Sequence, residues 1–490
     1  MKKWFNKWLS LCLMVLLMLS LWIPVSAESV LDTTTGQCTW QLKGTDLTIS
    51  GNGAMGDYEF ASLPWGTGIT SVTIEEGVTS IGDYAFRRCE ALTSVSIADS
   101  VQTIGKNAFE ECKKLKSVVL PKGITRLEQR TFAECAALES VVFPDTLTAI
   151  GIAAFGNCDS LTAVTLPDGV TTIGMGGFSG CSNLKSVTLP DSVRYIGEAA
   201  FSEAPAIYEK ANRHQGVVYL GNHAIRYIDP DYTDIRIREG TKSIADYAFE
   251  GGNRLRSITI PDSVVSIGNY AFARCGHLPS VEIPDSVEYL GFEAFSDCDE
   301  LVAVIVGAKV SIIEEYTFND CPQLRYVYLT SAVTKIEESA FYKCKQLTDI
   351  YYTGSEAQRD NIVIAEDNDP LVKATWRYNT DKKPALPTTT TKPTTTTTTA
   401  KPTTTTTTAV PTETTTSTSA SESVAVTTTQ ATAIQTEPAI STTSPIEEGK
   451  ETGGKTDKEK DNRGIVIGIA IAVIVIAGGV IALLLVRKKK

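Results

Sequence analysis

Histidine is the side chain that most often serves as a general base or a metal ligand at neutral pH, and this sequence is poor in it. The 490 residues contain three histidines, His214, His223 and His277. No thiol or carboxylate stands at ligand spacing from the first two, His277 occupies a variable position, and we expect all three to be solvated. The sequence also lacks a Gly-x-Ser-x-Gly elbow, a phosphate-binding loop, a His-Glu-x-x-His motif and a nucleotide fingerprint. It therefore predicts no catalytic residues, no cofactor and no metal site, and argues against an enzyme.

Cysteine is the other residue type that could do chemistry here. Of the 11 cysteines, Cys12 lies in an N-terminal leader and Cys38 stands alone. The other nine each come three residues after a regularly spaced phenylalanine, at positions 89, 112, 135, 158, 181, 275, 298, 321 and 344. Equivalent side chains in a parallel stack are ~4.8 Å apart and point the same way, whereas a disulfide needs Cβ atoms ~3.8 Å apart. We predict a buried ladder of free thiols.

Two further groups of side chains are candidates for binding. Aspartates that follow a proline recur in the repeats and could invite calcium, although turn capping explains them more simply: Asp145, Asp168, Asp191, Asp262 and Asp285. Outward strand positions are mostly Ser or Thr along the chain, but the last strands change to Ala303, Ile305 and then aromatic residues. Tyr326, Tyr328 and Tyr351, with Arg325, form the predicted ligand-binding patch, because exposed Tyr and Arg are enriched at binding hot spots. The alternative is that these rings only cover the C-terminal end of the fold.

A strict repeat must position these residues. Phenylalanine occurs at 86, 109, 132, 155, 178 and 201, and again at 249, 272, 295, 318 and 341. Nine of the ten intervals are 23 residues and one is 48. Such a period is typical of a solenoid, in which each unit buries its apolar face against its neighbours. In the unit that ends at Phe201, Leu184, Val187 and Leu189 predict a short strand with one inward face, and Pro190-Asp191 ends it.

The 48-residue interval contains extra structure. Val217–Leu220 and Ala224–Ile228 flank Gly221-Asn222, which predicts a β-hairpin with a two-residue turn. We expect this hairpin to protrude between a block of six repeats and a block of five. A binding insertion and a spacer both remain open at this point.

The repeat strings resemble the BspA-type bacterial leucine-rich repeats. The resemblance rests on strings such as Ile260-Pro261-Asp262-Ser263-Val264 and Tyr247-Ala248-Phe249, and covers about Gln37 to Asn379. It implies a leucine-rich repeat solenoid of 23-residue units with short parallel strands, in a family of secreted and surface proteins that adhere to host or neighbouring-cell proteins. Segments near Leu47–Trp65 and Tyr351–Thr375 are similar to the family's atypical end segments.

The two termini predict a single-pass surface protein. Residues 1–27 have a basic start, an apolar stretch and Val25-Ser26-Ala27, which is typical of a cleaved signal peptide. Gly464–Val486 is an apolar run of 23 residues, long enough for one transmembrane helix, and the basic residues 487–490 place its end in the cytoplasm. No Leu-Pro-x-Thr-Gly motif precedes this run, so we expect retention in the membrane. Threonine makes up 21 of the 31 residues from Thr388 to Thr418, which predicts an extended, coreless stalk.

Together these patterns predict the domain order. It is a signal peptide (1–27), an N-terminal cap (28–68), a first repeat block (69–201), an insertion with the hairpin (202–234), a second block (235–352), a C-terminal cap (353–380), a Thr-rich stalk (381–463), a transmembrane helix (464–486) and a basic tail (487–490). The net charge of −12 disfavours nucleic acid as a partner. We therefore predict a non-enzymatic, adhesin-like protein of the cell membrane that binds an extracellular protein of a host or neighbouring cell. The alternatives are an envelope-anchored module that binds polysaccharide and a surface hydrolase.

Overall fold

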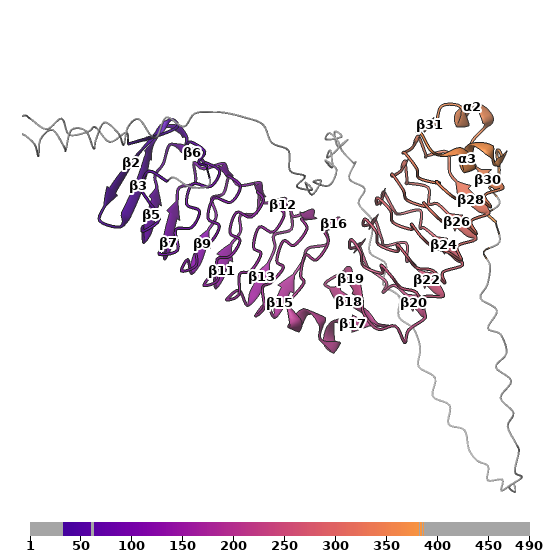
Figure 1. Cartoon of the computed structure of the whole chain (residues 1–490), viewed down its shortest axis with the longest axis horizontal. Helices are drawn as coiled ribbons and strands as arrows, with labels where there is room; N and C mark the ends of the chain where they lie inside the picture. The colour runs from indigo at the N-terminus through magenta and orange to yellow at the C-terminus, as the bar shows by residue number, and fades with distance from the viewer. Residues whose placement is uncertain (1–32, 60–62, 382, 385, 387–490) are drawn as a thin grey trace, which may run out of the picture. The chain divides into compact units, whose positions relative to one another are not determined.

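The computed structural model describes residues 33–59, 63–381, 383–384 and 386. The chain forms a solenoid in which most coils contribute one longer and one shorter strand, and equivalent strands of successive coils pair in parallel. The longer strands stack in one row and the shorter strands in a second row; Figure 1 shows β5 to β15 side by side, and β20 to β30 likewise. The 23-residue leucine-rich repeat solenoid predicted from the sequence is confirmed.

The long-strand row begins in the N-terminal cap and ends in the C-terminal cap. In chain order it consists of β3 (Asp46–Gly51), β5 (Ser71–Ile74), β7 (Ser94–Ile97), β9 (Ser117–Val119), β11 (Ser140–Val142), β13 (Ala163–Thr165), β15 (Ser186–Thr188), β20 (Asp234–Arg236), β22 (Ser257–Thr259), β24 (Ser280–Glu282), β26 (Ala303–Ile305), β28 (Tyr326–Leu329), β30 (Asp349–Tyr352) and β32 (Thr375–Arg377). We call the side of this row that faces away from the core the outer face.

The short-strand row follows the same order. It consists of β4 (Gly53–Ala54), β6 (Val78–Ile81), β8 (Thr103–Ile104), β10 (Arg126–Leu127), β12 (Ala149–Ile150), β14 (Thr172–Ile173), β16 (Tyr195–Ile196), β19 (His223–Tyr227), β21 (Ser243–Ile244), β23 (Ser266–Ile267), β25 (Tyr289–Leu290), β27 (Ile312–Ile313), β29 (Lys335–Ile336) and β31 (Val363–Ile364). The remaining elements are β1 (Thr34–Thr35), β2 (Cys38–Lys43), η1 (Pro205–Tyr208), η2 (Lys210–Asn212), β17 (Arg213–His214), β18 (Val217–Leu220), α2 (Glu356–Arg359) and α3 (Asp369–Lys373).

The phenylalanine turn closes each coil. The residues two before and two after the phenylalanine adopt left-handed backbone conformations, such as Tyr84 (φ 59°) and Arg88 (φ 60°) beside Phe86. These turns also bond from coil to coil, because the Phe86 N–H donates to the carbonyl of Ala108 at 2.7 Å and the pattern repeats in later coils. Backbone groups outside the strands are thereby paired, as a buried turn requires.

The core is a stack of rings. Phe109, Phe132, Phe155 and Phe178 are fully buried, and neighbouring ring centroids lie 5.2, 5.6 and 5.3 Å apart with planes within 8° of parallel. Trp65 of the N-terminal cap extends this stack beyond Phe86 at 5.6 Å. A 23-residue period of phenylalanine therefore becomes a continuous aromatic column along each block.

The predicted hairpin exists, but the prediction that it protrudes is wrong. β18 and β19 pair antiparallel, and β19 then pairs parallel with β21 of the second block. All four residues of Val217–Leu220 are buried, and Tyr227 stacks on Phe249 at 5.7 Å. The hairpin therefore starts the ring column of the second block, as Trp65 starts that of the first. Its alternating apolar residues belong to the core and not to a projecting arm.

The thiol ladder has the predicted form. The ten cysteines from Cys38 to Cys344 are buried and free. Ladder thiols donate to the carbonyl of the phenylalanine in the preceding coil, as Cys112 does to Phe86 at 3.3 Å and Cys135 to Phe109 at 3.2 Å. Burial raises the pKa of Cys135 to about 12 and that of Cys275 to about 12, which suppresses the reactive thiolate.

This ladder makes a direct prediction for thiol labelling. We expect residues 28–386, prepared without reductant, to show ten alkylated cysteines by mass spectrometry after denaturation. The native protein should label at almost none of them at pH 8, because all ten thiols are buried and out of reach of the reagent. Pairs of cysteines that label only after reduction would show that adjacent coils are bridged.

The predicted signal peptide, the transmembrane helix 464–486 and most of the stalk lie outside the described residues. Among the described residues, no helix has the length and apolar character needed to cross a bilayer. The strands of the described residues all lie between Thr34 and Arg377, so residues 28–386 contain this strand stack with both caps.

Candidate functional site: the outer face of the second block

The outer face changes character along the chain. In the first block it is open, and even apolar residues such as Val119 and Val142 are 64% and 56% exposed there. In the second block the outward residues Ala303, Ile305 and Tyr328 are only 0%, 2% and 6% exposed. The sequence predicted an exposed face throughout, so for these three residues the prediction is wrong. The described chain beyond β32 returns to this part of the face and accounts for part of the cover.

The four residues of the predicted patch lie on β28, just before it, and on β30. Tyr326 and Tyr351 have ring centroids 6.5 Å apart with planes inclined by 56°, and Tyr328 pairs in register with Tyr351. Arg325 is exposed, and its Nε and Nη2 donate to Gln346 Oε1 at 3.0 and 2.9 Å. The structure therefore brings the predicted side chains together on neighbouring strands.

The patch also contains charged residues that sequence reasoning missed. The Arg377 guanidinium lies 5.9 Å from the centre of the Tyr351 ring and bonds through Nε to Asp349 Oδ1 at 2.8 Å. Arg377 comes from β32 in the C-terminal cap, which pairs in register with β30. The pairing of the cap strand, which the sequence did not reveal, places this second arginine beside the tyrosines.

Tyr328 differs from the other members of the patch. Burial raises the pKa of its phenol, and the charges that act on it include Lys383, Asp381 and Asp285. Two of these residues belong to the returning segment after β32. Tyr328 thus lies beneath that segment and is not accessible to a ligand. The accessible residues of the patch are Arg325, Tyr326, Tyr351 and Arg377.

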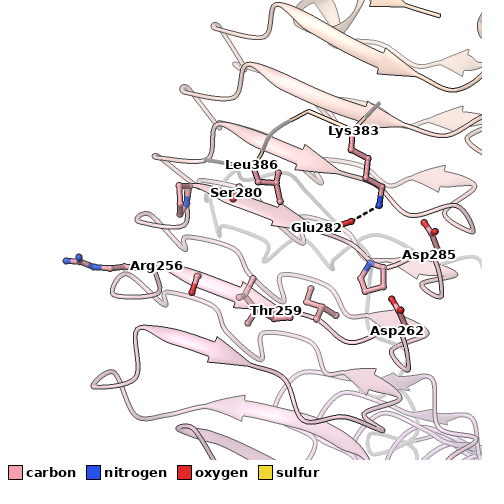
Figure 2. A pocket seen from close by; sticks show the side chains of 13 residues that line it. Arg256, Thr259, Asp262, Ser280, Glu282, Asp285, Lys383 and Leu386 are labelled. Carbon is pink, nitrogen blue, oxygen red and sulfur yellow. Dashed lines mark hydrogen bonds and ion pairs between the residues drawn. The ribbon is translucent and has the colours of Figure 1, made fainter. Parts of the chain in front are cut away.

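A groove of about 670 Å³ lies over β22 and β24, and β26 separates these strands from the patch strand β28. Its floor is formed by β22 and β24 and the turns that follow them, and its roof includes Lys383 and Leu386 (Figure 2). Three carboxylates, from Asp262, Glu282 and Asp285, line it. Lys383 Nζ donates to Glu282 Oε1 at 2.6 Å across the groove.

Two of the aspartates that follow a proline accept hydrogen bonds from neighbouring parts of the chain. Asp285 Oδ1 accepts from the backbone N–H of Ala308 in the next coil at 2.9 Å, and Asp191 Oδ1 accepts from Asn222 Nδ2 at 2.8 Å. Among the described residues, no group of three or more His, Cys, Asp or Glu side chains is placed to hold a metal ion.

One histidine departs from the prediction. His214 and His277 are exposed, but His223 is fully buried between the two blocks. Its Nε2 lies 3.0 Å from the carbonyl oxygen of Pro190, which can only accept, so Nε2 carries the proton and Nδ1 accepts from Ser243 Oγ at 2.8 Å. Burial lowers the pKa of His223 to about 4, so it is neutral at pH 7. The prediction that His223 is solvated is wrong, because this side chain bonds to Ser243 of the second block and to Pro190 of the first.

Comparison with known proteins decides the family. The model of the BspA type leucine rich repeat region matches residues 54–174, 148–251 and 220–348. The chain belongs to the BspA-type leucine-rich repeat family. No curated protein matches the chain.

Solved structures of bacterial proteins are similar to this BspA-type chain. A leucine rich cell surface protein from Faecalibacterium prausnitzii is 31% identical, over 67% of this chain and 97% of that chain, with a TM-score of 0.33. A leucine-rich repeat protein from Eubacterium ventriosum is 24% identical, over 73% and 96%, with a TM-score of 0.35. The pneumococcal vaccine antigen PcpA is 19% identical, over 68% and 97%, with a TM-score of 0.31.

Proposed function

We propose that this BspA-type protein is a non-enzymatic adhesin that binds an extracellular protein through the outer face of its second block. The observation that carries the proposal is the cluster of Arg325, Tyr326, Tyr351 and Arg377 on that face. Tyr and Arg provide large contact area and directional hydrogen bonds, and they dominate protein-binding hot spots. Four such side chains on three neighbouring strands form a preorganised surface, because the backbone pairing fixes their spacing.

A polysaccharide ligand is the second candidate. Tyrosine rings can stack on sugar rings, and Tyr326 and Tyr351 are both half-buried and face solvent in part. Their planes are inclined by 56°, however, so the two rings do not form one flat platform. This inclination favours a protein ligand with side chains that fit between the rings.

Binding to parallel arrays of extracellular proteins and glycans tests the proposal. We expect residues 28–386 to bind a protein, and Tyr326→Ala/Tyr351→Ala to weaken that binding at least tenfold. Arg325→Ala, which removes an exposed side chain, is a second variant that should leave the fold intact. The matched control is Thr165→Ala/Thr188→Ala on the exposed outer face of the first block. Binding that is unchanged by the tyrosine and arginine variants, or lost equally in the control, would contradict the proposed site.

We also propose that residues 464–486 anchor the protein in the cell membrane and that the Thr-rich stalk carries the solenoid outward. The support is the apolar length of this run, which as a helix at ~1.5 Å per residue would cross a bilayer core of ~30 Å. Expression of the full chain should place it in the membrane fraction, and a chain that stops at Arg463 should be released. Retention of the shorter chain would contradict this anchor.

A further inference from the structure

The covered stretch of the outer face has an identifiable occupant in the chain itself. After β32, Asn379 N–H donates to the carbonyl of Gly354 at 3.0 Å, and Thr380 N–H donates to that of Tyr352 at 3.3 Å. Lys383 then reaches Glu282 on β24, and Leu386 lines the groove with Ser257 and Thr259 of β22. The segment therefore crosses the long strands from β30 back toward β22.

The reach of this segment agrees with an extended backbone. From β30 to β22 there are four strand spacings of ~4.8 Å, or about 19 Å. Leu386 comes six positions after Thr380, and an extended chain can span about 20 Å over six steps. The distance is thus within reach of the chain, and Pro384 favours an extended conformation at its own position and at Lys383 by fixing its own φ and restricting the residue before it.

The contacts along the segment are complementary in charge and polarity. Lys383 meets Glu282, and Asp285 and the Tyr328 phenol also act on its ammonium group. In Figure 2 the lysine side chain extends from the returning segment to Glu282, while Leu386 lies near Ser280. We propose that this groove is a binding site for an extended peptide that carries lysine, proline and then an apolar residue, and that its resident occupant is the part of this chain that carries Lys383, Pro384 and Leu386.

The groove retains room beyond its occupant. About 670 Å³ remains between the floor strands and the roof made by Lys383 and Leu386, with Asp262 and Asp285 at its edge. The Lys383 and Glu282 side chains are 44% and 48% exposed, so this ion pair alone contributes little free energy. The binding free energy must come from the segment as a whole. The assignment is independent of the proposed adhesin function, because it concerns a contact within the chain.

Zero-length crosslinking of residues 28–463, the whole predicted extracellular part, tests whether Lys383 occupies the groove. A carbodiimide activates a carboxyl group, and a lysine amine in contact then displaces the urea to form an amide. We expect an amide between Lys383 and Glu282 by peptide mass spectrometry, and its loss in Glu282→Gln. Lys309 and Glu288, an exposed pair at 2.9 Å, provide the internal control. Formation of the control crosslink without the Lys383 crosslink would overturn the docking.

A labelled peptide tests whether the groove is a binding site in its own right. The probe is a fluorescent peptide of residues 378–390, and the open form is residues 28–463 with Lys383→Ser, Pro384→Gly and Leu386→Ser. We expect the peptide to bind this variant at least tenfold more tightly than the unaltered protein, because a tethered occupant competes at high effective concentration. Adding Glu282→Gln should weaken binding, whereas Glu139→Gln on the first block should not. No binding to the open form, or equal binding to both forms, would overturn the proposal.

Discussion

Replacing Phe155 with alanine should lower the free energy of unfolding by about 3–5 kcal/mol, the range for removing a fully buried phenylalanine from a close-packed core. The side chain is fully buried and stacks on Phe132 at 5.6 Å and on Phe178 at 5.3 Å. Phe143 also meets its ring edge-on at 5.8 Å. The substitution removes three ring contacts and leaves a cavity that the flanking coils cannot close without breaking their own ladder.

Denaturant unfolding of residues 28–386 followed by circular dichroism measures this loss. Val142→Ala is the matched control, because Val142 lies in the same coil region but is 56% exposed, and we expect a change within about 0.5 kcal/mol. If Phe155→Ala were as stable as Val142→Ala, the claim that the ring column stabilises the fold would be contradicted. A biphasic transition would locate the break in the first block, since a solenoid couples mainly nearest neighbours.

The joint between the two blocks should respond to acid through His223. Its pKa falls from an ordinary value near 6.5 to about 4 on burial, so between these pH values the unfolded chain binds a proton that the folded chain does not. The stability that His223 contributes is complete above pH 6.5 and is lost as the pH falls toward 4. The shift corresponds to about 3 kcal/mol.

Asp246 at the same joint acts in the opposite direction. Its carboxylate accepts from Tyr195 of the first block at 2.7 Å and from the Asn269 N–H at 2.7 Å, and burial raises its pKa to about 6. The folded chain therefore holds a proton between pH 4 and 6 that the unfolded chain releases. The contribution of Asp246 is complete below pH 4 and falls as the pH rises to 6, so it partly cancels that of His223.

Two substitutions separate the opposing contributions. As the pH falls from 6.5 to 4, the free energy of unfolding of Asp246→Asn should decrease more than that of the unaltered protein. That of His223→Gln should decrease less. Denaturation midpoints of residues 28–386 at several pH values measure both slopes, and the comparison with unaltered protein removes the effect of the other carboxylates. Parallel slopes for all three proteins would show that neither group is buried as described.

Much of the fold follows from local sequence periodicity. The 23-residue spacing of phenylalanine and cysteine fixes which side chains stack, because equivalent positions in a solenoid must lie above one another. The hairpin strands were also predicted, since Gly221-Asn222 marks their turn. The predictions for the ring column and the thiol ladder succeeded because the surroundings of these residues are copies of their own repeat.

The sequence could not supply contacts between unlike parts of the chain. The sequence predicts a solvated His223, and only the packing of the hairpin between the blocks shows that it bonds to Pro190 and Ser243. The sequence predicts that Tyr328 faces outward, and only the return of Asp381 and Lys383 to this face shows that it lies beneath another part of the chain. Arg377 joins the tyrosines through cap pairing that no repeat template predicts. Each failure concerns a single non-repeated contact.

The most direct test of the account is amide hydrogen exchange of residues 28–386 with and without the protein ligand that the array identifies. The account predicts slower exchange on binding in β28, β30 and β32, which carry the patch, and little change in β5 to β15. Protection confined to the first block would contradict the assignment of the binding site to the second.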